Sequence, residues 1–274
     1  PFGTKTRNKQ KEEANGMKKE EKEPRFQIKY LLNSAVLIQY GNEKLLIDGI
    51  LSNHQMFDIY DEPTQNAIWE RKNEFEGLNY LIFTHCHNDH YGRKNVCRFL
   101  ELNPGVKVLI PSNHRIPDEF ICEAEKKNSR FYIMRGEPGQ IQKLDFGTLK
   151  IEFMKTEHTT FRYPEHYCIN IISPFENVVL TADMEFNRIP LLQNFSKKAY
   201  ASIFINHLAL LHRAWRNELL ALQYDKIYFY HLPTAERDYY QYRPRALRNW
   251  EKYQKDFPMG ELLDYQPSEQ KKFK

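Results

Sequence analysis

Three histidines and one aspartate fall within six positions of this chain, at His85, His87, Asp89 and His90. They come directly after residues 80–83, an apolar run that predicts a buried strand ending in polar side chains. Imidazole and carboxylate groups together suit cations such as zinc, manganese or iron. His85 and His87 can face one ion, while Asp89 and His90 can face a second. The spacing therefore predicts a site for metal ions on the loop after a strand.

Other ligand-type residues stand alone, each at the end of a β-rich segment: Asp48, His158, Asp183 and His231. Together with the first cluster, in type and in order, they resemble the metallo-β-lactamase-fold hydrolase superfamily, whose central motif is His-x-His-x-Asp-His. The resemblance covers residues 26 to about 235. It implies an α/β protein, a four-layer α/β/β/α sandwich with the site at one edge of two packed sheets.

The resemblance also implies a ligand set for two divalent ions, with zinc expected and manganese or iron left open. The first ion would be held by His85, His87 and His158, and the second by Asp89, His90 and His231. The Asp183 carboxylate would bridge the two ions. Two ions about 3.5–4 Å apart can share a hydroxide and lower its pKa toward neutrality. Asp89 and Asp183 are therefore the residues predicted to be catalytic. Asp48 is implied to orient the histidine-rich loop, as outer carboxylates do.

Two histidines compete for the last ligand position, because both follow buried strands. His231 is favoured over His207, since it comes after a further helix and strand. His207 remains a candidate for substrate binding. His166 is a candidate hydrogen-bond donor to the substrate or transition state, with a buried structural role as the alternative. His54 is a further candidate for substrate contact.

The cysteines and the hydropathy pattern bear on location. The chain has four cysteines but no C-x-x-C pair, which favours reduced thiols. Cys86 alternates with His85 and His87, so its thiol is predicted to point away from the metals. No apolar segment approaches the length of a membrane span, and the N-terminus is rich in Lys and Glu. A cytoplasmic protein without a membrane partner is the expectation.

Most of the net charge lies in the N-terminal segment. The whole chain carries +4, and residues 1–25 hold eight basic and five acidic side chains, which leaves about +1 for the rest. We expect residues 1–25 to be a disordered charged tail, with Met17 a candidate for the native start. Residues 26–274 are expected to form a single domain. Because its charge is near neutral, no extended nucleic-acid surface is predicted.

Hydropathy periods predict the remaining elements. Residues 49–78 show no regular period and are expected to form a long loop over the strand ends. Residues 167–172 and 177–181 predict a hairpin around Pro174. Four segments show helical patterns: residues 91–102, 118–127, 213–224 and 243–256.

The departures from the wider superfamily suggest a substrate class. Aspartate at position 183 differs from the Cys or Ser of classical zinc β-lactamases, and resembles the glyoxalase, lactonase and phosphodiesterase branches. Only 48 positions separate Asp183 from His231, too few for the inserted domain of the nucleic-acid-cutting branch. The expected function is hydrolysis of a small ester, lactone or phosphodiester. The alternatives are an RNA-processing nuclease and a di-iron protein that handles oxygen or sulfur; homo-oligomerisation is left open.

Overall fold

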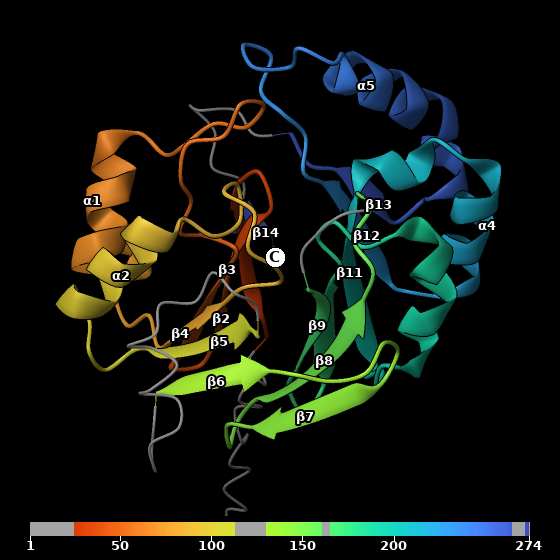
Figure 1. Cartoon of the computed structure of the whole chain (residues 1–274). Helices are drawn as coiled ribbons and strands as arrows, with labels where there is room; N and C mark the ends of the chain where they lie inside the picture. Colours follow the sequence, from red (N-terminus) through yellow and green to blue (C-terminus); the bar gives the residue numbers. More distant parts are fainter. Residues whose placement is uncertain (1–24, 113–129, 161–164, 265–271, 274) are drawn as a thin grey trace, which may run out of the picture.

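The computed structural model describes residues 25–112, 130–160, 165–264 and 272–273, which form two facing β-sheets with helices on their outer sides (Figure 1). The first sheet has seven strands in the order β14-β1-β2-β3-β4-β5-β6. Its strands are β1 (Gln27–Leu32), β2 (Ala35–Tyr40), β3 (Glu43–Ile47), β4 (Tyr80–Ile82), β5 (Lys107–Pro111), β6 (Phe131–Met134) and β14 (Lys272–Phe273). The predicted four-layer sandwich is confirmed.

The second sheet repeats this plan in the order β13-β12-β11-β10-β9-β8-β7. Its strands are β7 (Ile141–Asp145), β8 (Lys150–Thr156), β9 (His166–Ile172), β10 (Glu176–Leu180), β11 (Tyr200–Asn206), β12 (Lys226–Tyr230) and β13 (Gly260–Leu262). In each sheet antiparallel strands are followed by parallel ones, from β3 to β6 and from β10 to β13. Carboxyl ends of parallel strands meet at one edge, which is where such sheets place their sites.

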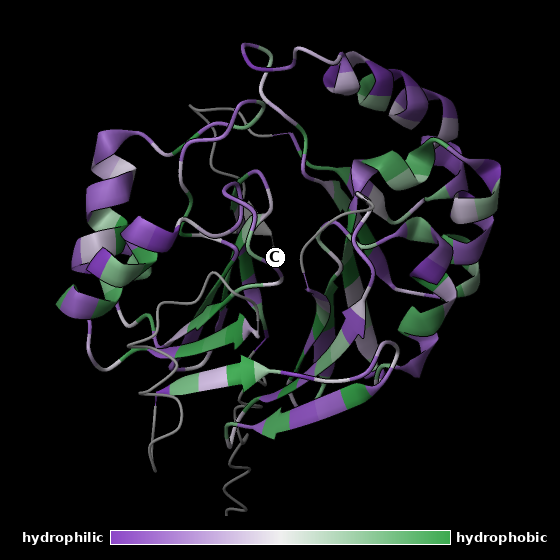
Figure 2. Cartoon of the chain, in the orientation of Figure 1, coloured by the Kyte–Doolittle hydropathy of each residue, from purple (hydrophilic) through white to green (hydrophobic). Residues whose placement is uncertain are grey.

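Apolar side chains form three layers of core. Alternation along the strands sends Ile38 and Phe153 into the space between the sheets and Leu46 to the outer face of the first sheet. There α1 (Glu62–Glu70) and α2 (Arg93–Leu102) cover the sheet, with Ile68 and Phe99 fully buried. The second sheet is covered by α4 (Arg213–Ala221) and α5 (Tyr242–Tyr253). Figure 2 shows the polar outer faces of these helices.

Several predicted elements are confirmed and one prediction is wrong. The hairpin exists, since β9 and β10 pair antiparallel with Asn177 opposite Ile172. The segment 49–78 is not one irregular loop, because it contains α1 and the short 3₁₀ helix Asn73–Phe75. Asp61 caps α1 by accepting a hydrogen bond from the Thr64 N–H at 2.9 Å. The helix was missed because only Ala67 and Ile68 are buried on it, which is too narrow a stripe to give a period.

Three calls fall wholly or mostly outside the described residues: the tail 1–25, the helix 118–127 and the position of Met17. The C-terminal helix is present as α5 and the short 3₁₀ helix Gln254–Asp256. Among the described helices, none combines the length and apolar character that crossing a membrane requires.

Candidate metal centre

The histidine-rich loop begins where β4 ends, and three other strand ends lie next to it. His158 follows β8, Asp183 follows β10 and His231 directly follows β12. Asp48, Ala182 and His231 have positive φ angles of 48°, 43° and 69°, which non-glycine residues adopt rarely. Such backbone is kept where the surroundings require it, often at functional sites. Here it turns each chain segment sharply at the end of its strand.

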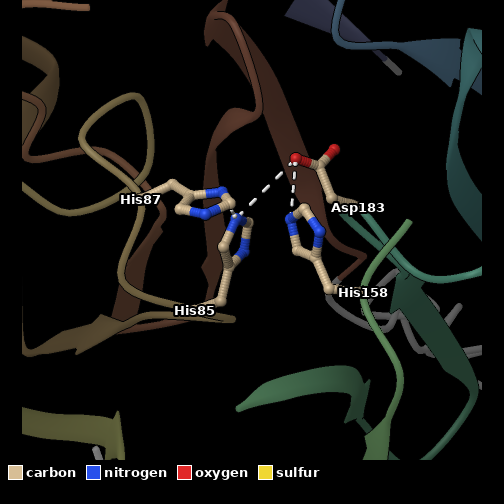
Figure 3. Close-up of side chains that lie close together, drawn as sticks. All are labelled: His85, His87, His158 and Asp183. Carbon is tan, nitrogen blue, oxygen red and sulfur yellow. Dashed lines mark hydrogen bonds and ion pairs between the residues drawn. The ribbon is translucent and has the colours of Figure 1, made fainter. Parts of the chain in front are cut away.

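One group of side chains brings His85, His87, His158 and Asp183 together, with one ligand-type atom of each within 4.8 Å of the others. His85 Nε2 lies 3.2 Å from His87 Nδ1 and 3.7 Å from Asp183 Oδ2. His158 Nε2 lies 3.4 Å from the same carboxylate oxygen. Figure 3 shows the three imidazoles and the carboxylate converging on one point.

A second group contains Asp89, His90, His231 and again Asp183. The Nε2 atoms of His90 and His231 are 2.9 Å apart. Asp89 Oδ2 lies 3.6 Å from His90 Nε2 and 3.5 Å from His231 Nε2. Asp183 directs Oδ2 to His90 and Oδ1 to His231, each at 3.5 Å. This carboxylate is therefore shared by the two groups.

Asp48 fixes the orientation of both groups from behind. Its Oδ1 accepts the Thr84 N–H at 2.8 Å, and its Oδ2 accepts the Thr84 hydroxyl at 2.6 Å. The same Oδ2 lies 2.9 Å from His90 Nδ1, and Thr84 Oγ1 lies 3.1 Å from His85 Nδ1. With Nδ1 of His90 engaged by this carboxylate, Nε2 faces the cluster and offers a lone pair to a cation when the ring is neutral.

The donor set fits divalent cations. The Nε2 atoms of His90 and His231 face each other at 2.9 Å, so only one of them can carry a proton in the space between them. A cation bound there would instead accept a lone pair from each nitrogen. His158 Nε2 is buried and has no hydrogen-bond partner among the described residues, although a carboxylate is close. Mixed imidazole and carboxylate donors are those of zinc, manganese and iron sites.

Comparison with known protein families shows to which family the chain belongs. Residues 28–231, which include all seven of these side chains, match the metallo-β-lactamase superfamily. This chain belongs to the metallo-β-lactamase superfamily. The predictions of family, fold and a metal-dependent enzyme are thereby confirmed at the level of the superfamily.

Relatives of the superfamily agree with this placement. A UPF0173 metal-dependent hydrolase of Aeropyrum pernix is 33% identical over 82 residues, 30% of this chain and 28% of that protein. The chain thus matches about a quarter of that curated relative's length. Igni18, a metallo hydrolase of Ignicoccus hospitalis, has 16% identity and a TM-score of 0.57, covering 91% of this chain and 98% of that one.

Other solved structures of this fold differ in their chemistry. The di-iron β-hydroxylase CmlA of Streptomyces venezuelae has 14% identity and a TM-score of 0.58, covering 90% of this chain and 54% of that one. An isothiocyanate hydrolase from Delia radicum gut bacteria has 13% identity and a TM-score of 0.56, covering 90% and 98%. At these identities the likeness shows the metallo-β-lactamase fold alone.

Burial and neighbouring charges set the pKa values of the histidines in the two groups. Burial lowers the pKa of His85 well below its ordinary value and that of His87 to about 4. Burial would also lower the pKa of His90, but the adjacent Asp89 and Asp48 raise it well above the ordinary value. Neutral imidazoles can accept a cation without first losing a proton. The anionic surroundings that stabilise a proton on His90 also suit a cation.

Asp183 is the carboxylate that both groups share, and its charge state follows from its neighbours. Burial would raise its pKa, yet His231, His158 and His90 hold that pKa well below the ordinary range. The carboxylate is therefore anionic at neutral pH.

The histidines predicted to contact substrate take three different positions. His166 is fully buried, and its Nδ1 lies 2.8 Å from Thr156 Oγ1 with the ring 5.3 Å from the His85 ring. His207 is also buried, belongs to neither group, and has Nδ1 3.2 Å from the Tyr230 carbonyl oxygen. His54 lies in the segment before α1, half-buried. Among these three, His166 lies next to the cluster.

Cys86 lies apart from both ligand groups. It is buried among apolar side chains of the first sheet's outer face. The prediction that its thiol points away from the metals agrees with this position.

Asn206 was missed by sequence reasoning. Its Nδ2 donates to Asp183 Oδ1 at 2.9 Å, while its Oδ1 accepts the Leu208 N–H at 3.1 Å. The second bond fixes which end of the amide faces Asp183. A polar residue ending β11 at the ligand-bearing edge was the available signal.

A cavity of about 790 Å³ opens beside His158. Thr156, Thr160 and the members of two ion pairs are among the residues that line it. Lys155 pairs with Glu165 at 2.7 Å, and Arg188 donates two hydrogen bonds to Glu157 at 2.8 and 2.7 Å. Its volume is that of a site for a small molecule.

Proposed function

We propose that this chain is a dinuclear metal-dependent hydrolase acting on a small ester, lactone or phosphodiester. The observation that carries the proposal is the shared Asp183, whose two oxygens face two complete groups of ligand-type side chains. We infer the ligand roles predicted for these seven residues from this arrangement, and zinc as the ion. Two divalent cations bound there would lower the pKa of a bound water and polarise the substrate oxygen.

The chain's own residues orient the ligand-type side chains. Asp48 and Thr84 fix the rings of His85 and His90, and Asn206 fixes Asp183. Such outer contacts hold ligands in the geometry that a cation needs. His166, buried against His85 and His158, is placed to form a hydrogen bond toward the reacting group. The cavity beside His158 supports a compact substrate.

The substrate proposal is tested by offering the metal-loaded protein matched small substrates. Bis-p-nitrophenyl phosphate, a lactone, a thioester and a β-lactam sample the relevant reaction classes. We expect turnover of an ester, lactone or phosphodiester, and no cleavage of structured RNA at physiological salt. Site-specific RNA cleavage with no activity on any small substrate would replace this function by that of a nuclease.

We expect two metal ions per chain after loading and removal of excess metal. Seven ligand-type side chains exceed what one tetrahedral site uses. Elemental analysis against protein concentration gives the number directly. One ion or none in folded protein contradicts the dinuclear proposal, and iron in place of zinc in protein purified without added metal would change the identity of the ion.

Replacement of Asn206 by alanine should lower kcat/KM by about 10–100-fold, the range found for contacts behind metal ligands. The fold should persist, because Asn206 lies at a strand end. Asn103→Ala is a matched control: its buried amide donates to the Trp69 and Phe99 carbonyls, on the helical side of the first sheet. Equal activity losses in the two variants would show that Asn206 acts only through stability.

A further inference from the structure

Residues 53–58, which we call the strap, lie over the second ligand group and are fixed at both ends. Their amino-terminal end continues from a segment bound to the histidine-rich loop: the Ser52 N–H donates to the Asn88 carbonyl at 2.8 Å, and the Gly92 N–H donates to the Ile50 carbonyl at 2.6 Å. Gly92 is required there, because a Cβ at that position would lie 2.4 Å from the Leu51 carbonyl oxygen.

The other end of the strap is held through Asp58 to the segment that follows His231. Asp58 Oδ1 pairs with Arg237 Nε at 2.7 Å, and Asp58 Oδ2 accepts the Thr234 hydroxyl. Arg237 Nη1 also donates to the His54 carbonyl at 3.0 Å. The backbone carbonyl of Asp58 accepts a hydrogen bond from the side-chain Nδ2 of Asn33 at 3.0 Å. The strap therefore joins three segments that are far apart in the sequence.

Between these two ends, Phe57 packs directly on the last ligand. Its ring centroid is 4.5 Å from that of His231, with the planes at 73°. Phe57 is 8% exposed and His231 is 2% exposed. His231 has a positive φ of 69°, a backbone conformation that is kept where the surrounding structure requires it, and Phe57 is part of those surroundings.

The two ligand groups differ in access. Asp89, His90 and His231 are all buried, whereas His87 is half-buried and His158 borders the cavity. An ion in the second group would be covered on the side of Phe57. An ion in the first group would face the cavity.

We propose that Asp58 is a positioning residue that fastens the strap, so that Phe57 holds His231 in place and closes the second ion site, leaving the His87 and His158 side as the entrance. This inference rests on the proposed dinuclear function. Its consequence is that the second ion leaves slowly and the first ion exchanges readily.

A purely stabilising role for Asp58 is the competing explanation. The Asp58 and Arg237 side chains are 28% and 34% exposed, and ion pairs of that kind contribute little to stability. Arg243, in α5, and Asp264, shortly after β13, form a comparable pair whose side chains are 16% and 23% exposed. Asp264→Ala is therefore a matched control for Asp58→Ala.

The experiment follows the release of Co²⁺ from the loaded full chain into excess chelator, by the visible absorption of the bound ion. The parent protein should release two ions in two phases. A His87→Ala variant, which keeps only the second group complete, identifies the phase of the second ion. In Asp58→Ala we expect that phase to accelerate about tenfold or more, with the other phase and Tm close to those of Asp264→Ala.

Phe57→Ala and Arg237→Gln provide two further variants, in case Asp58→Ala folds poorly. Each should accelerate the same phase, Phe57→Ala by removing the cover and Arg237→Gln by loosening it. Unchanged release in all three, or equal acceleration of both phases, overturns the role of the strap. Absence of Co²⁺ binding to the parent protein would instead contradict the proposed dinuclear function, on which this inference rests.

Discussion

Asp183→Ala should lose the second metal ion and lower kcat/KM by more than about 100-fold, beyond the range for residues that only support metal ligands. The reason is that the Asp183 oxygens face both ligand groups, so no other described side chain holds the two ions at a working separation. Elemental analysis and turnover of the best small substrate, measured on the same preparation, check both losses.

The fold should survive this change. Asp183 follows β10 in a loop, and the apolar layers on both faces of the second sheet do not depend on it. Asp183→Asn is the conservative comparison, since it keeps the side-chain shape and one oxygen acceptor but loses the negative charge. Two retained ions with near-normal turnover in the alanine variant would contradict the bridging role. An unfolded alanine variant would leave Asp183→Asn to decide the same question.

The fold could be predicted where local pattern and packing agree. The strands that bury both faces, such as β9 and β12, are nearly continuously buried and mostly apolar. The strand β7 was missed, because residues 141–145 lie at a sheet edge with only partly buried or exposed side chains. The helix α1 was missed for a related reason, since it buries little. Elements at the margin of a core carry a weaker pattern than elements within it.

The ligand-type residues could be predicted because strand ends concentrate them, and the structure brings all seven together. Asn206 also ends a strand, but its residue type gave no such signal, because an amide is not a typical zinc ligand. The strap lies further beyond sequence reasoning. Its Asp58–Thr234 contact joins residues 176 positions apart, which no local period reveals. Residues that bind an ion are recognisable by type, whereas residues that hold the ligands depend on tertiary contacts.

His231→Ala should lower kcat/KM by more than about 100-fold, while His207→Ala should change it by less than about tenfold. Both histidines are buried at neighbouring strand ends, so the two variants are matched in burial. They differ in what the ring faces. His231 Nε2 lies 2.9 Å from His90 Nε2 and 3.5 Å from Asp89, whereas His207 Nδ1 lies 3.2 Å from the Tyr230 carbonyl oxygen.

The metal content of the two variants shows which histidine binds the ion, independently of activity. His231→Ala should retain one ion per chain and His207→Ala two, because only His231 completes the second ligand group. In crystals of the zinc-loaded parent, His231 Nε2 should lie about 2.0–2.1 Å from an ion. A zinc at that distance from His207 instead, with one ion lost from His207→Ala, would reverse the assignment. Because removal of a buried side chain lowers stability, both measurements are made at a temperature well below the lower Tm.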